Sequence, residues 1–231
     1  MKPADEQASA WTEAFDSGKF VRKSSEFRDS ISKGGAFDIE SGRYHLYISH
    51  ACPWAHRTLI MRTLLGLEDH ISVDVVDWRM NADGSWSFNP DEEGATVDTV
   101  NGESSLEGIY NRAFEGWNES RSIGTVPVLW DKKHATIVNN ESREIIRMFD
   151  QFSKEGFGNG ATLCPPELMQ EIDNMIDANY ESVNNGVYKS GFARTQEAYD
   201  EAVTALFERL DQLEAHLDGR EWLVGEDKGQ L

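Results

Sequence analysis

The sequence predicts an α/β domain followed by a purely helical region. Three observations support this fold class. Strand-like alternation at residues 44–49 passes directly into helical spacing at 53–65, a second strand-like segment precedes a hairpin, and only helical periodicity follows residue 166. A chain of 231 residues can hold one large domain or two small ones, and either can bury a core.

The first predicted strand and helix adjoin at residue 52. In "RYHLYIS" the residues Tyr44, Leu46 and Ile48 alternate with polar neighbours, which is the period of a strand. The helix begins at Pro53, since proline suits a first turn in which the missing N–H costs nothing. Gly66 suits its end.

The remaining elements complete a recognisable order. We expect a strand at 71–77, an inserted polar loop at 81–105, a short helix at 108–117, a hairpin at 126–138 and an amphipathic helix at 141–152. Two parallel strands joined by a crossover helix, then a hairpin and a closing helix, describe a thioredoxin-like unit. The sequence therefore predicts an irregular N-terminal arm at 1–42 and a thioredoxin-like thiol-binding domain at 43–153.

The last third of the chain is helical in pattern. One helix is expected at about 166–184 and another at about 195–217, separated by a glycine-containing break, "NNGVYKSGFA". Two helices cannot bury their facing stripes well, and residues 218–231 add no further periodic segment. We therefore expect 166–231 to be an incomplete all-α domain that exposes apolar side chains.

The charge balance restricts the partners. The 41 acidic residues outnumber the 22 basic ones, which leaves a net charge of −19, and arginines outnumber lysines 13 to 9. A surface that is acidic and poor in lysine is what a salt-rich cytoplasm favours, because salt screens its self-repulsion. Nucleic acid is excluded as a partner because no basic stripe exists to displace counterions. No signal peptide or membrane span is evident, so we expect a cytoplasmic protein.

Cys52 is the strongest candidate for chemistry. The first turn of a helix presents unpaired N–H groups and the positive end of the dipole, so a thiol placed there ionises more readily. Ala55 stands where a Cys-x-x-Cys motif has its second cysteine, so a disulfide cannot be resolved within the motif. We expect a monothiol cycle, in which Cys52 takes on a small thiol and a second thiol removes it. The alternative is a buried, inert cysteine.

Other roles for these residue types are weaker. His45, His50, Cys52 and His56 fall within twelve residues, but zinc sites have tighter paired spacings, so no metal is expected. His45 is expected to point out of its strand. Cys164 is interpreted as structural, and two cysteines in all indicate a reducing compartment.

Three longer motifs together resemble a known family. The segments "GRYHLYISHACPWAHRTLIMRTLLGLEDHISV", "GTVPVLWDKKHATIVNNESREIIRMFD" and "VNNGVYKSGFARTQEAYDEAV" are similar to those of the glutathionyl-hydroquinone reductases, the xi class of glutathione transferases. The resemblance runs from about residue 20 to the end. It implies a thioredoxin-like domain, an all-helical domain and removal of glutathione from glutathionyl-hydroquinones by a cysteine nucleophile.

The resemblance also implies roles for individual residues. Cys52 would attack the sulfur of the glutathionyl adduct and release the hydroquinone, and a second thiol would reduce the resulting mixed disulfide. Trp86 would pack against glutathione; the alternative is an aromatic that merely covers the domain. Glutathione or γ-glutamylcysteine is the expected co-substrate.

Further matches fall on ligand-binding positions. Pro127 is the expected cis-proline, and Val126 would offer its backbone N–H and C=O to the peptide part of the ligand. Glu141 and Ser142, at a helix start, would bind the ammonium and carboxylate of a γ-glutamyl group; simple helix capping is the alternative. Arg121 is the candidate for the other carboxylate of the ligand.

The helical region carries one matched site residue and one departure. Tyr188 would hydrogen-bond the phenolic substrate or the thiolate; core packing is the alternative. Members of the family continue past "GQL" with further helices, so we expect either a fragment or an early-ending gene, and a homodimer where the helical domain is complete. A conjugating transferase, or an inactive thiol-binding module left by truncation, are the competing functions.

Overall fold

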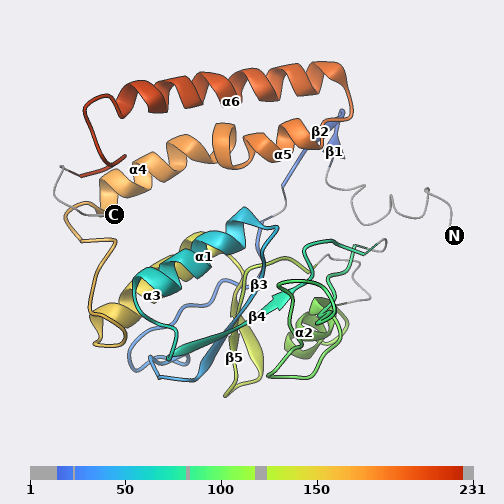
Figure 1. Cartoon of the computed structure of the whole chain (residues 1–231), viewed down its shortest axis with the longest axis vertical. Coiled ribbons are helices and arrows are strands. Elements are labelled where there is room, and N and C mark those ends of the chain that lie inside the picture. Colours follow the sequence, from blue (N-terminus) through green and yellow to red (C-terminus); the bar gives the residue numbers. More distant parts are fainter. Residues whose placement is uncertain (1–14, 23, 82–83, 118–123, 226–231) are drawn as a thin grey trace, which may run out of the picture. The chain divides into compact units, whose positions relative to one another are not determined.

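The computed structural model describes residues 15–22, 24–81, 84–117 and 124–225 (Figure 1). The described chain divides into two compact units. The first contains Ser25–Thr162, and the second combines the segment before Ser25 with the residues from Leu163 onward. The predicted arm is therefore shared between the two units. A hairpin of two short strands, β1 (Phe15–Asp16) and β2 (Lys19–Phe20), belongs to the second unit.

The first unit is built on a four-stranded sheet of order β4-β3-β5-β6. Strand β3 (Tyr44–Ser49) pairs in parallel with β4 (Ile71–Val76), and β5 (Val128–Asp131) pairs antiparallel with both β3 and β6 (Thr136–Asn139). The predicted strands and hairpin are all present. A single parallel pair followed by an antiparallel hairpin is the sheet expected of a thioredoxin-like unit.

Three helices complete this unit. Helices α1 (Pro53–Leu64) and α3 (Ser142–Lys154) lie side by side, and α2 (Leu106–Ala113) lies across the sheet from them (Figure 1). Helix α2 begins two residues before the predicted start and ends earlier than residue 117. The largest fully buried side chains come from both faces of the sheet: Trp130, Tyr44, Tyr47, Tyr110, Phe149 and Phe152.

The burial of strand β3 differs from the alternation of apolar and polar residues that predicted it. All six of its residues are buried, because helices and loop residues cover both faces of this central strand. His45 was expected to point outward, and this was wrong. Its ring is fully buried, with Nδ1 2.7 Å from the hydroxyl of Ser72 and Nε2 3.1 Å from the carboxylate of Asp74. The polar positions of this strand therefore pair inside the protein.

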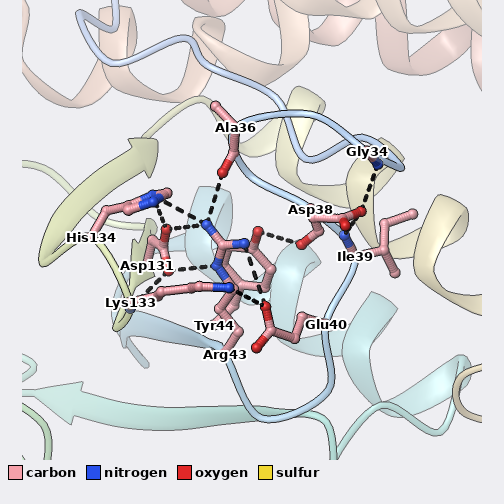
Figure 2. A network of polar contacts seen from close by, with 10 residues as sticks. All are labelled: Gly34, Ala36, Asp38, Ile39, Glu40, Arg43, Tyr44, Asp131, Lys133 and His134. Carbon is pink, nitrogen blue, oxygen red and sulfur yellow. Dashed lines mark hydrogen bonds and ion pairs between the residues drawn. The ribbon is translucent and has the colours of Figure 1, made fainter.

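A polar network fastens the segment before β3 to the end of the sheet (Figure 2). The guanidinium of Arg43 donates from Nε and Nη2 to the two carboxylate oxygens of Asp131, at 2.8 and 2.6 Å, and both side chains are buried. Arg43 also donates to the backbone oxygen of Ala36. Burial alone raises the pKa of Asp131, but the bonds from Arg43 and the Lys133 backbone hold that pKa below its usual value.

The inserted loop between β4 and α2 is irregular but tied at both ends. Ser87 forms an isolated β-bridge with Ser105, just before α2. Within the loop, one carboxylate oxygen of Asp98 accepts from the hydroxyl of Tyr47 on β3 at 2.8 Å, and the other accepts from the backbone of Glu103 at 2.9 Å. The insertion is thus anchored to the central strand.

The second unit is helical except for the small β1–β2 hairpin. Helix α4 (Met169–Asn179) continues into a π-helical turn, η4 (Tyr180–Asn184), and a short helix, α5 (Gly186–Gly191), follows. The break predicted at 184–193 is thus mostly helical, and Gly186 is the buried first residue of α5. Helix α6 (Gln196–His216) begins at Thr195, whose hydroxyl accepts from the backbone of Ala198.

The helices of this second unit bury few side chains. Helix α4 has no buried residue. On α6 the apolar residue Leu206 is buried, whereas Phe207 and Leu210 are 59% and 38% exposed. This agrees with the expectation that the helical region leaves apolar side chains exposed. No helix in the described parts of the chain combines the length and apolarity needed to cross a bilayer.

Candidate active site

Cys52 lies where β3 passes into α1. Its backbone is extended, with φ −102° and ψ 112°, and it is the N-cap residue of the helix. The backbone N–H of Cys52 donates to Ser49, and its carbonyl accepts the first helical bond from His56. Pro53 at the first helical position has no N–H to leave unpaired. The side chain is partly exposed, and neither Cys52 nor Cys164 forms a disulfide.

The cis-proline faces this thiol. The Val126–Pro127 peptide bond is cis, as expected. The thiol of Cys52 donates to the carbonyl oxygen of Val126 at 3.5 Å, so the structure brings together Cys52, Val126 and Pro127. Cys52 and Val126, which are 74 positions apart, therefore meet because β5 pairs with β3 and starts directly after the cis bond.

Tyr110 on α2 holds the segment before the cis bond, and the sequence analysis missed it. Its hydroxyl donates to the carbonyl of Thr125 at 2.8 Å and accepts from the Thr125 backbone at 3.2 Å and from the amide of Asn140 at 3.0 Å. The ring is fully buried, and burial raises the pKa of Tyr110, so the hydroxyl stays a donor. An aromatic residue on a short helix carries no sequence signal for such a role.

The start of α3 forms the second part of the site. Glu141 is the N-cap residue, and its carboxylate accepts from the Arg143 backbone at 3.2 Å and from the hydroxyl of Ser25 at 3.1 Å. The capping alternative is therefore realised by Glu141 itself. Ser142 follows as the first helical residue and is 3% exposed. The backbone N–H groups of such a first turn attract anions.

Arg57 joins the two parts, and the sequence analysis did not select it. It projects from α1 and donates from Nε and Nη2 to the hydroxyl of Ser142, at 3.0 and 2.6 Å. Its Nη2 also lies 3.6 Å from the carboxylate of Glu141. The guanidinium carbon lies 4.9 Å from the ring centroid of Trp54. A cation thus stands beside the start of α3, where the sequence analysis selected only Glu141 and Ser142.

The sequence analysis also selected Arg121 and Trp86. Arg121 lies outside the described residues. Trp86 is partly exposed in the inserted loop, where its carbonyl accepts from the backbone of Leu106 at the start of α2. The packing of Trp86 against glutathione stays a prediction.

Tyr188 belongs to the second unit. It lies on α5, where its ring stacks on Phe20 at 6.2 Å between centroids, and the guanidinium of Arg22 lies 4.3 Å from the ring centroid. Arg22 in turn donates to the side chain of Asn185 at 2.7 Å. These contacts order the ring; its role toward a substrate stays a prediction.

No cluster of three or more potential metal ligands occurs among the residues that the structure describes. The histidines near Cys52 are accounted for otherwise. His45 pairs with Ser72 and Asp74, and His56 is exposed on α1. The hydrogen bonds from His45 and Thr99 outweigh burial and lower the pKa of Asp74.

The first unit is thioredoxin-like, with a cysteine at the start of α1 and a cis-proline segment beside its thiol. The start of α3 adds backbone N–H groups that attract anions. These features define a thiol-binding domain of the glutathione transferase type. Comparison with known proteins agrees. Residues 51–151 match the model of the glutathione S-transferase N-terminal domain. The chain belongs to the xi class of glutathione transferases, the family that includes the glutathionyl-hydroquinone reductases.

Three relatives support that assignment. The chain is 47% identical to the glutathionyl-hydroquinone reductase PcpF of Sphingobium chlorophenolicum, over 94% of this chain and 67% of the relative. It is 48% identical to the glutathionyl-hydroquinone reductase YqjG of Escherichia coli, over 90% and 65%. The crystal structure of the glutathione S-transferase Xi from Phanerochaete chrysosporium matches with a TM-score of 0.86 and 46% identity, over 93% and 68%.

A glutathione-bound structure of YqjG also matches, with a TM-score of 0.80 and 47% identity, over 87% of this chain and 66% of that one. The chain therefore spans about two thirds of the length of the curated relatives it matches.

Proposed function

We propose that this chain is a thiol-dependent reductase that removes glutathione, or a related γ-glutamyl thiol, from glutathionyl-hydroquinones through a mixed disulfide on Cys52. One observation carries the proposal. The thiol of Cys52 is partly exposed at the N-terminus of α1 and lies 3.5 Å from the carbonyl oxygen of Val126, beside the cis peptide bond. Relatives that carry the name glutathionyl-hydroquinone reductase support the same reading.

The first step is nucleophilic. The thiolate of Cys52 attacks the sulfur of the glutathionyl-hydroquinone, and the electron pair of the carbon–sulfur bond passes to the ring carbon, which takes up a proton. The products are the free hydroquinone and a Cys52–glutathione disulfide. The N-terminus of α1 favours the anionic sulfur before attack.

The second step restores the thiol. A second glutathione, as its thiolate, attacks the glutathione sulfur of the mixed disulfide, which releases glutathione disulfide and the Cys52 thiolate. The net reaction consumes one glutathionyl-hydroquinone and one glutathione and yields one hydroquinone and one glutathione disulfide. Ala55 makes this external step necessary, because no neighbouring cysteine is present to displace the bound thiol.

The ligand would be held by both parts of the site. The backbone N–H and C=O of Val126 pair with the peptide part, as an added strand would. Glu141 and Ser142 receive the γ-glutamyl ammonium and carboxylate, and Trp86 packs against the ligand. Arg121 and Tyr188 keep the roles that the resemblance implies. We also propose a cytoplasmic setting and, where the helical domain is complete, a homodimer, which a sedimentation-equilibrium measurement of mass would check.

The test is a turnover assay on a glutathionyl-hydroquinone with excess glutathione. We expect hydroquinone and glutathione disulfide in equal amounts from the wild type, none from Cys52→Ser, and wild-type rates from Cys164→Ser. Circular dichroism confirms that both variants fold. A Cys52→Ser variant that retains the reaction, or that gains conjugation of glutathione to an electrophile, would favour the conjugating transferase and refute the proposal.

A further inference from the structure

Arg57 contacts three groups that belong to different parts of the site. Its guanidinium donates twice to the hydroxyl of Ser142 and lies 3.6 Å from the carboxylate of Glu141. Its other side faces the ring of Trp54. Arg57 is five residues after Cys52 on the same chain segment, so one helix carries both the reactive sulfur and the cation at the start of α3.

The two bonds to Ser142 determine what that hydroxyl offers to a ligand. A serine hydroxyl has one hydrogen to donate and lone pairs that accept. Both Nε and Nη2 of Arg57 donate to the oxygen, at 3.0 and 2.6 Å, and so occupy its acceptor side. The hydroxyl hydrogen is thereby directed away from Arg57. A carboxylate, which only accepts hydrogen bonds, is the ligand group that suits it.

The charge of Arg57 matters for the same end of α3. The N-cap residue Glu141 is itself anionic and would repel a ligand carboxylate in a protein whose net charge is already −19. The guanidinium offsets that charge, and both side chains are only about one quarter exposed, so screening by solvent is incomplete. Glu141 remains available to an ammonium group. The pair of opposite charges matches the zwitterionic end of a γ-glutamyl group.

The spacing along α1 fits the same ligand. Five residues of helix correspond to about 7.5 Å of axial rise. Two extended residues span about 7 Å, and a γ-linkage adds two carbon atoms. The rise along α1 between Cys52 and Arg57 is therefore of the same order as the length of a γ-glutamyl-cysteine unit.

We propose that Arg57 is a positioning residue that makes the start of α3 selective for the γ-glutamyl group of the thiol substrate. It does so by turning the hydroxyl of Ser142 into a donor and by offsetting the charge of Glu141. This inference rests on the proposed function and deepens it, because it gives a role in reading the γ-glutamyl end to a cation that the sequence analysis did not select.

The experiment measures how fast Cys52 forms a mixed disulfide with two small disulfides, by intact-protein mass spectrometry. Glutathione disulfide carries the γ-glutamyl group, and the disulfide of cysteinylglycine lacks it. We expect the wild type to react faster with glutathione disulfide by roughly 10- to 100-fold, the range of a lost hydrogen bond to a charged group. Arg57→Gln should bring this ratio close to one and leave the cysteinylglycine rate within about twofold.

Two further variants separate selectivity from structure. Lys33→Gln removes one positive charge from an exposed ion pair with Glu155 in the same unit, and should keep the wild-type ratio. Arg57→Lys keeps the charge but loses the forked donor, so its ratio should fall between those of the wild type and Arg57→Gln. Circular dichroism verifies folding.

The outcomes are distinguishable. If Arg57→Gln slows both disulfides equally, or if Arg57→Gln or Arg57→Lys keeps the full ratio, the inference is overturned while the proposed function stands. A wild type that reacts with both disulfides at equal rates also overturns it. A wild type in which neither disulfide modifies Cys52 refutes the proposed function itself.

Discussion

Replacing Asp131 by asparagine should destabilise the first unit by about 3–5 kcal/mol, because the change leaves the buried charge of Arg43 without its carboxylate. Asp131 accepts from Nε and Nη2 of Arg43 at 2.8 and 2.6 Å, and its side chain is 0% exposed (Figure 2). Asparagine preserves the size of the side chain and one acceptor oxygen. The expected loss of stability is therefore electrostatic and does not come from a cavity.

The same arginine supplies a matched control. Glu40 lies 3.6 Å from Arg43, but its side chain is 49% exposed, and exposed ion pairs contribute less than about 1 kcal/mol. Glu40→Gln should therefore change stability little. Both variants remove one carboxylate beside the Arg43 guanidinium, but Glu40 is exposed and also pairs with Lys133 at 3.0 Å, whereas Asp131 is buried and hydrogen-bonded to Arg43.

The assay is amide hydrogen exchange with mass spectrometry across a urea series, read on peptides that cover β3 and β5. This reports the first unit within the full chain. We expect the urea midpoint of these peptides to fall strongly in Asp131→Asn and to stay near wild type in Glu40→Gln. Equal effects in the two variants, or a loss below about 1 kcal/mol in Asp131→Asn, would refute the reasoning.

Further expectations concern the pH dependence of stability, Gly158 and the start of α3. The pKa values of Asp131 and Asp74 are lowered in the folded state, so their contribution to stability is present above the usual value of 3.8 and is lost as the pH falls further. Urea midpoints measured from pH 5 to pH 3 should therefore decline. A flat profile would contradict this. In urea titrations, Gly158→Ala should destabilise the first unit by about 1–3 kcal/mol more than Gly156→Ala. A Cβ added at Gly158 would lie 2.1 Å from a backbone oxygen at the end of α1, whereas one added at Gly156 would meet nothing within 4 Å. Equal losses of stability would argue against that close approach. Ser142→Ala should slow the reaction of Cys52 with glutathione disulfide by roughly tenfold, and an unchanged rate would remove the hydroxyl from the site.

Local patterns predicted the sheet and the helix starts well, because each depended on neighbouring residues. Pro53 and Gly66 mark the two ends of α1, and Gly66 has the left-handed φ of +64° expected just after a helix. The cis bond at Pro127 is different. It followed from resemblance, since an X-Pro dipeptide alone does not specify the isomer.

The errors arose where tertiary packing decides. His45 reads as the polar side of a strand, yet the protein supplies Ser72 and Asp74 as partners on the adjacent strand, and no pattern within β3 reveals them. Gly186 reads as a helix breaker, but it is buried and begins α5 soon after the π-helical turn.

Arg57 shows the same limit for the site. An arginine on a helix usually extends into solvent, so its type and position gave no reason to select it. Its partners, Glu141 and Ser142, are more than eighty residues away and become neighbours only because α1 and α3 lie side by side. The tyrosine that holds the cis-proline segment, Tyr110, was missed for the same reason.

The central claim is that Cys52 is a lone nucleophile that carries a small thiol and returns it to another. Its most direct test is the intact mass of the protein after exposure to glutathione disulfide, with the modified peptide identified. The account predicts a single glutathione adduct on Cys52, removed by excess glutathione, with buried Cys164 unmodified. No adduct, an adduct on Cys164 alone, or one on Cys52 that excess thiol does not remove would contradict it.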